Sequence, residues 1–154
     1  MPHPIILYDG VCGLCNRLNQ FVLRRDHDGI FLFASLQSPF AARILARHGA
    51  NPQDLDTVYV VVNHDLTKHD LAREAQPNER LLPRSDAIIF VLKRLGGIWK
   101  LLGVFLRLLP RVLRDAAYRI VARNRYRIFG RFEACMLPSA EHRNRFLDIG
   151  WTER

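Results

Sequence analysis

Two cysteines separated by two residues, Cys12 and Cys15, are the residues of this sequence best suited to chemistry. They follow a short apolar run, Ile5–Tyr8, and open a proline-free stretch with apolar residues at helical spacing, so they are expected where a strand leads into a helix. This spacing brings both sulfurs to one helix end, close enough for a disulfide. Unpaired backbone N–H groups and the helix dipole favour a thiolate on Cys12, with a pKa below the free value of ~8.5. Cys15, one turn deeper, is the expected resolving thiol.

Two alternatives for the cysteine pair are half of a zinc site and two unreactive thiols in the core. A zinc site usually needs a second ligand pair at similarly close spacing, and the best remaining pair, Cys135 and His142, is too widely spaced. Placement at a helix N-terminus favours thiolate chemistry instead. We therefore expect a redox pair with no bound metal and no organic cofactor, and we expect Cys135 to be a free, partly buried thiol.

The elements that must position the pair can be predicted from local patterns. Apolar runs predict strands over residues 5–8 and 30–34, and amphipathic spacing predicts helices over residues 12–25 and 39–48. Ser38 and Pro39 give the second helix an N-cap and a proline at its first position. Strand, helix, strand and helix in this order predict two parallel strands joined by crossovers.

The following residues predict an antiparallel pair and a third helix. Residues 57–62 are rich in valine and read as a strand, and residues 80–83 read as an edge strand that returns antiparallel. Ser85 and Asp86 are expected to cap a helix that ends at Gly96. The order βαβα followed by ββα is the thioredoxin-like arrangement, an α/β fold, and residues 1–97 are sufficient to build it.

Residues 98–154 are expected to form a basic, mainly helical extension packed on this core. Residues 91–154 hold 14 Lys and Arg against 5 Asp and Glu, a balance of +9, whereas residues 1–90 have a balance of −1. Helices are expected over residues 98–109 and 112–129, with a break at Pro110. We expect the first of them to bury four side chains on the sheet and to show its cations to water: Trp99, Leu102, Phe105 and Leu109.

Several segments resemble one known family. The segment Tyr8-Asp9-Gly10-Val11-Cys12-Gly13-Leu14-Cys15-Asn16 resembles the signature of the DCC-type thiol-disulfide oxidoreductases. The resemblance continues through residues 84–87, 109–111, 118–130 and 135–138, so it covers most of the chain. It implies a thioredoxin-like fold and dithiol–disulfide exchange, with Cys12 and Cys15 as the redox pair.

Four further residues are candidates for the site. Asp9, three residues before Cys12, is either a proton acceptor that tunes the thiols or a turn-former in an Asp-Gly dipeptide. Ser85 and Asp86 resemble the helix cap that binds a γ-glutamyl group in glutathione-using relatives of the fold, or they form a plain N-cap. Thr57 stands in the stretch before the third strand, where thioredoxins carry a cis-proline that lines the substrate groove. Substrate docking is therefore expected to differ here.

The preferred interpretation is a small cytoplasmic thiol-disulfide oxidoreductase, acting as a protein-disulfide reductase. Its 154 residues are 49% hydrophobic and 25% charged, which fits one globular domain. Three cysteines and the lack of a signal peptide favour the reducing cytosol. The expected partners are a disulfide-containing protein or a low-molecular-weight thiol and an external reductant, without nucleic acid. The alternative is a basic protein that binds nucleic acid or a membrane surface and has structural or zinc-binding cysteines; residues 98–109 are too short to span a bilayer.

Overall fold

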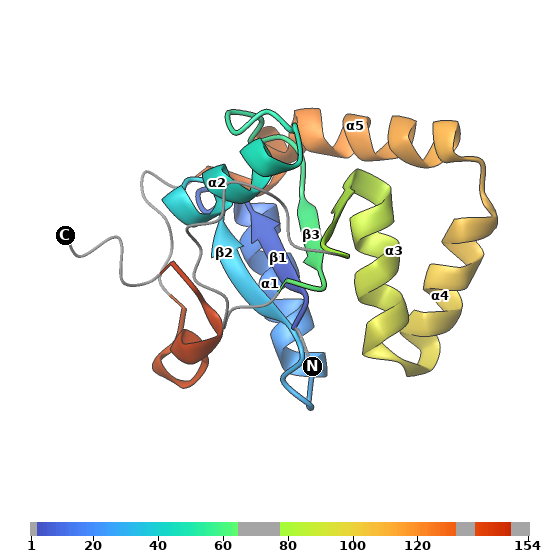
Figure 1. Ribbon diagram of the computed structural model, residues 1–154. Coiled ribbons are helices and arrows are strands. Elements are labelled where there is room, and N and C mark those ends of the chain that lie inside the picture. The colour runs from blue at the N-terminus through green and yellow to red at the C-terminus, as the bar shows by residue number, and fades with distance from the viewer. Residues whose placement is uncertain (1–2, 65–77, 132–137, 149–154) are drawn as a thin grey trace.

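The computed structural model describes residues 3–64, 78–131 and 138–148 (Figure 1). Its first half contains β1 (Ile5–Tyr8), α1 (Gly13–Arg25), β2 (Leu32–Ser35) and α2 (Pro39–Arg47). β1 and β2 pair in parallel, as predicted. The N–H groups of Ile30 and Phe31 donate to the Asp26 carboxylate at 3.0 and 2.9 Å. They therefore cannot pair in the sheet, and β2 begins two residues later than expected.

The second half of the core contains β3 (Tyr59–Val62), β4 (Arg80–Pro83) and α3 (Arg84–Leu95). The sheet order is β2-β1-β3-β4, and β3 runs antiparallel to both of its neighbours. β4 is an edge strand, which suits Pro83 because proline has no N–H to donate. This arrangement confirms the thioredoxin-like α/β fold.

The sheet has helices on both faces, because alternate side chains of each strand point to opposite sides. On one face Ile6 and Val60 pack with α1 and α3, and on the other Ile5 and Val61 pack with α2. Both cysteines belong to the first of these clusters. The dithiol pair is therefore built into the core rather than placed on an exposed loop.

Two further helices, α4 (Gly97–Leu108) and α5 (Arg111–Phe129), follow the core, and a short 3-10 helix spans Ala140–Arg145. Figure 1 shows α4 at the edge of the molecule, with α3 between it and the sheet, and α5 across one end of the molecule. α4 packs on α3, and α5 contacts α1 and α3. Among the described residues, no helix is long and apolar enough to cross a membrane.

The expectation that α4 buries its large side chains on the sheet is wrong. Leu102, Phe105 and Leu109 are exposed, and Trp99 packs edge-on against Phe21 of α1. The contact of α4 with α3 is made through Gly103, where an added Cβ would lie 3.3 Å from the Ile89 carbonyl oxygen. The side of α4 that carries Gly103 is therefore buried against α3, and the side that carries the large apolar residues is exposed to solvent. The division into 1–97 and 98–154 stays a prediction.

Candidate active site

The two cysteines lie at the start of α1, as the sequence predicts. Cys12 is the N-cap residue, with φ −84° and ψ 124°, and its sulfur accepts a hydrogen bond from the backbone N–H of Cys15 at 3.4 Å. Both thiols are free and buried. A sulfur at the N-cap occupies the place where a serine or aspartate oxygen usually satisfies the first N–H groups of a helix. That position stabilises negative charge on Cys12.

The surroundings of the two thiols separate their pKa values. A hydrogen bond from the Cys15 thiol, opposed by burial and helped by the Cys15 N–H and the charge of Arg125, lowers the pKa of Cys12 from 9.0 to about 6. The hydrogen bond to Cys12 and burial raise the pKa of Cys15 well above its ordinary value. At neutral pH, Cys12 is therefore mostly thiolate and Cys15 is a thiol that donates to it.

Asp9 is buried, and its carboxylate is surrounded by donors. Oδ1 accepts from the N–H of Val11 at 3.1 Å and from Nε2 of Gln37 at 2.7 Å. Oδ2 accepts from Nη2 of Arg125 at 3.1 Å and from the hydroxyl of Tyr126. The bond to Val11 forms the turn that leads into α1, while the bonds to Arg125 and Tyr126 attach α5 to the site.

Arg125 was not predicted as a site residue. It is buried, and Nη2 also donates to the Leu55 carbonyl at 3.0 Å and to Asp56 Oδ1 at 2.9 Å. Its charge is thereby fixed between Asp9, the loop before β3 and Cys12. Tyr118 lies about two turns before Arg125 on α5, and its hydroxyl oxygen accepts a hydrogen bond from the Val58 N–H at 2.8 Å. The loop that lacks the cis-proline of thioredoxins is thus held by α5.

The C-terminal end of α5 also closes over the start of α1. The N–H of Gly13 donates to the Gly130 carbonyl at 3.1 Å, and Cys12 forms a single antiparallel bridge with Arg131. Gly13 is required here, because an added Cβ would lie 2.2 Å from the Phe129 carbonyl oxygen. Cys12 is fully buried in this arrangement.

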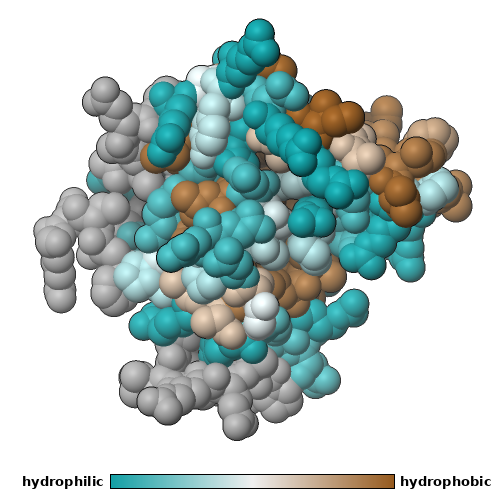
Figure 2. All heavy atoms as spheres, turned by 90° about the horizontal axis from the view of Figure 1, so that it is seen from above, coloured by the Kyte–Doolittle hydropathy of each residue, from teal (hydrophilic) through white to brown (hydrophobic). Residues whose placement is uncertain are grey.

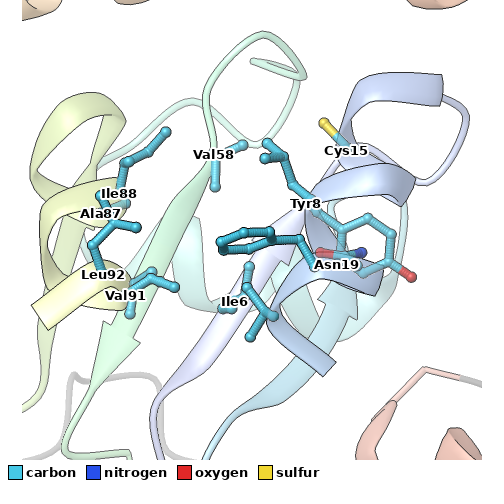
Figure 3. Close-up of a pocket in the computed structure, with 13 residues that line it drawn as sticks. Ile6, Tyr8, Cys15, Asn19, Val58, Ala87, Ile88, Val91 and Leu92 are labelled. Carbon is cyan, nitrogen blue, oxygen red and sulfur yellow. The ribbon is translucent and has the colours of Figure 1, made fainter. Parts of the chain in front are cut away.

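Cys15 faces two apolar cavities. The smaller, of about 90 Å³, lies between the sheet, α1 and α3, and Figure 3 shows Cys15 at one end of it with Val58 and Ile88 farther along. The larger, of about 400 Å³, lies among α1, α3, α4 and α5, and both Cys15 and Arg125 line it. The dithiol pair is therefore adjacent to space that an apolar group could enter.

The other predicted site residues are placed less centrally. Ser85 is not the N-cap of α3; Pro83 holds that position, and the Ser85 hydroxyl donates to Asp115 at 2.6 Å instead. Ser85 also lines the larger cavity. Asp86 forms ion pairs with Arg111 at 3.1 Å and with Arg114 at 3.4 Å.

Thr57 is buried, and its hydroxyl donates to Asp54 at 3.0 Å. Cys135 lies outside the described residues. Within the described ranges, no group of three or more His, Cys, Asp or Glu is placed to hold a metal ion.

The sheet, the flanking helices and the cysteine pair at the start of α1 define a thioredoxin-like protein with a dithiol site. Residues 6–131 match the DCC1-like thiol-disulfide oxidoreductase family. The chain belongs to this family, as its signature segment suggested.

Two relatives are similar over most of the chain. YuxK of Bacillus subtilis is 35% identical over 147 residues, which are 96% of this chain and 96% of that protein. A DCC family protein of Arabidopsis thaliana, described as chloroplastic, is 34% identical over 134 residues, which are 87% of this chain and 69% of that protein. No solved structure matches the chain at a significant level.

Proposed function

We propose that the protein is a thiol-disulfide oxidoreductase that reduces disulfides through Cys12 and Cys15, in keeping with its family. The observation that carries the proposal is the position of Cys12 at the N-cap of α1, with its pKa lowered to about 6 beside a Cys15 thiol whose pKa is raised. A lowered pKa makes one sulfur the nucleophile, and a raised pKa keeps the other protonated until it is needed.

In the first step, the Cys12 thiolate attacks one sulfur of a substrate disulfide. The substrate S–S bond breaks, its second sulfur leaves with the electron pair and takes up a proton, and Cys12 becomes part of a mixed disulfide. The negative charge on Cys12, a cause of the raised pKa of Cys15, is then gone. Cys15 loses its proton and attacks Cys12, which releases the second substrate thiol and leaves a 12–15 disulfide. An external thiol reductant returns the two electrons.

Because Cys12 is buried against Gly130 and Arg131, a substrate sulfur reaches it when that contact opens. Asp9 acts as a positioning residue that holds Arg125 near Cys12. Its second proposed role is to accept the proton that Cys15 loses in the resolving step. Ser85, Asp86 and Thr57 remain proposed substrate contacts. A cytoplasmic location, and protein disulfides or small thiols as substrates, complete the proposal.

The test uses three variants, in each of which one cysteine is replaced by serine. In Cys15→Ser the resolving thiol is missing, so mixed disulfides through Cys12 should accumulate and survive non-reducing electrophoresis. Cys12→Ser should abolish both this trapping and the reduction of an insulin-type disulfide, and Cys135→Ser is the matched control that should change neither. Mass spectrometry of the oxidised native protein should find a 12–15 disulfide that dithiothreitol reverses. Stoichiometric zinc, or thiols inert to mild oxidant, would refute the proposal.

A fourth variant tests the origin of the lowered pKa. Cys15→Ala removes the hydrogen-bond donor that is the largest cause, so the pKa of Cys12 should rise from about 6 toward 9.0. Cys15→Ser keeps a hydroxyl donor and should show a smaller rise. The measurement is the rate of iodoacetamide alkylation of Cys12 as a function of pH, and equal midpoints for the two variants would contradict this account.

A further inference from the structure

α4 exposes a continuous apolar face. Ile98, Leu101, Phe105 and Leu108 are 72%, 70%, 61% and 78% exposed. Their spacing of three, four and three residues places them on one side of the helix, away from Gly103, which packs on α3. The exposure of these four side chains means that the described part of the chain leaves this face uncovered.

The apolar surface continues onto the start of α5. Val112 is 76% exposed and Leu113 is 59% exposed. Figure 2 shows hydrophobic side chains gathered at the end of the molecule where α4 and the start of α5 lie, beside hydrophilic side chains that follow α5. We call this the α4–α5 apolar surface, and it consists of Ile98, Leu101, Phe105, Leu108, Val112 and Leu113. Large exposed apolar patches with a polar rim mark contact with a protein or a membrane.

The charge around this surface is positive. Exposed cations lie on the polar sides of both helices, and they are Lys100 and Arg107 on α4 and Arg111, Arg119, Arg123 and Arg127 on α5. Residues 98–131 contain a single carboxylate, Asp115. That carboxylate is already held by the Ser85 hydroxyl at 2.6 Å and by Arg111 at 3.7 Å. Apart from Arg111, which also pairs with Asp86 of α3 at 3.1 Å, these cations have no acidic partner on α4 or α5.

We propose that the α4–α5 apolar surface docks on an anionic lipid bilayer, with α4 lying in the plane of the interface. A helix with an apolar face and with Lys and Arg on its polar face binds membranes in this way, through apolar burial and attraction to acidic headgroups. A nucleic acid would pair the cations but leave the apolar face in water. Spanning is excluded for α4 by its 12 residues, so the contact is peripheral.

Docking in this orientation brings the dithiol site close to lipid. Leu113 belongs to the α4–α5 apolar surface and also to the wall of the 400 Å³ cavity that Cys15 lines. The docked protein therefore holds Cys15 one apolar cavity away from the bilayer. The docking proposal does not depend on redox activity, and Cys12→Ser should bind vesicles as the natural protein does.

The experiment is co-sedimentation of the full chain with vesicles. Vesicles of equimolar phosphatidylcholine and phosphatidylglycerol should bind the protein, and vesicles of phosphatidylcholine alone should bind it much more weakly. Leu108→Glu should reduce partitioning about tenfold or more, because a large apolar side chain is no longer buried. Leu108→Met keeps an apolar side chain and should bind as the natural protein does.

A second pair of variants separates position from net charge. Arg107→Glu should reduce binding at least about fivefold, whereas Arg80→Glu on β4 changes the net charge equally and should have little effect. Equal binding of Leu108→Glu and the natural protein would overturn the proposal. So would a stable dimer in lipid-free solution that Leu108→Glu dissociates, because the surface would then be an interface between two copies.

Discussion

Arg125 is the residue whose replacement should reveal most about how the site is held together. It is buried with Asp9, and its Nη2 bonds to Asp9 at 3.1 Å and to Asp56 at 2.9 Å. Removing one partner of a buried ion pair costs about 3–5 kcal/mol, because the other charge is left without compensation. Asp9 keeps three other donors, so Arg125→Met should lower the free energy of unfolding by about 3 kcal/mol, at the lower end of that range.

Arg125→Met should also raise the pKa of Cys12 above about 6, since the charge of Arg125 is one of the causes that lower it. Urea unfolding followed by circular dichroism measures the first effect, and the pH dependence of Cys12 alkylation measures the second. Arg125→Lys keeps the charge but loses the planar fork, so it should lose stability with a smaller change in the pKa of Cys12.

A double-mutant cycle isolates the pair itself. Asp9→Asn removes the charge that Arg125 compensates, so the combined variant should lose less stability than the two single variants together, by about 1–3 kcal/mol. Arg123→Met, at an exposed position of the same helix, is the control and should stay within about 0.5 kcal/mol of the natural protein. Additive single effects, or an Arg125→Met protein as stable as the control, would refute this account of the site.

Three further substitutions test other contacts. Gly13→Ala places a Cβ 2.2 Å from the Phe129 carbonyl oxygen, so it should push α5 away from the start of α1. The free energy of unfolding in urea should fall by about 1–3 kcal/mol, and Cys12 should be alkylated faster. An unchanged alkylation rate would count against the closure of α5 over Cys12. The pKa of the Glu79 carboxyl is raised by burial, but hydrogen bonds from His64 and His48 outweigh burial and lower the pKa below 4.5. The Glu79 carboxylate therefore stabilises the fold above pH 4.5, and this contribution disappears as the pH falls through the folded pKa. Glu79→Gln should therefore be less stable at neutral pH and lose less stability on acidification, and parallel acid profiles of the two proteins would contradict this. Tyr118→Phe removes the acceptor of the Val58 N–H and should cost about 0.5–1.5 kcal/mol and speed hydrogen exchange at that amide, whereas unchanged exchange would show that another group satisfies it.

The sequence predicted the elements whose signals are local. The strand before Asp9, the cysteine pair at the first turn of α1, and the Ser38 cap and Pro39 start of α2 can each be read from a few neighbouring residues. The exact ends of strands were missed where a side chain takes the N–H, as Asp26 does for Phe31.

The charged part of the site could not be predicted in the same way. Arg125 meets Asp9 across 116 residues of sequence, and no spacing rule predicts such a contact. One signal was present: Tyr118, Ala122, Arg125 and Phe129 follow each other at steps of four, three and four, so Arg125 lies on the stripe of α5 that faces the core. An arginine on a buried stripe requires a buried acceptor.

The burial of α4 was predicted wrongly for a different reason. The spacing of Leu101, Phe105 and Leu108 predicts an apolar helix face, but it does not show whether that face packs against the same chain or against another surface. The structure places Gly103 against α3 and leaves the large side chains exposed.

The long separation between Asp9 and Arg125 also has a consequence for the newly made chain. A ribosome adds about 5–20 residues per second, so the 116 residues added after Asp9, up to and including Arg125, take roughly 6–23 s to synthesise. During this interval neither Arg125 nor the chain at Gly130 and Arg131 exists to lie against Cys12. The two thiols therefore leave the ribosome before α5 can cover Cys12 or place the charge of Arg125 beside it. Completion of α5 closes the contact of Gly130 and Arg131 over the start of α1 and adds the charge of Arg125 to the hydrogen bonds that already favour a Cys12 thiolate. The synthesis of α5 therefore determines when the site is closed.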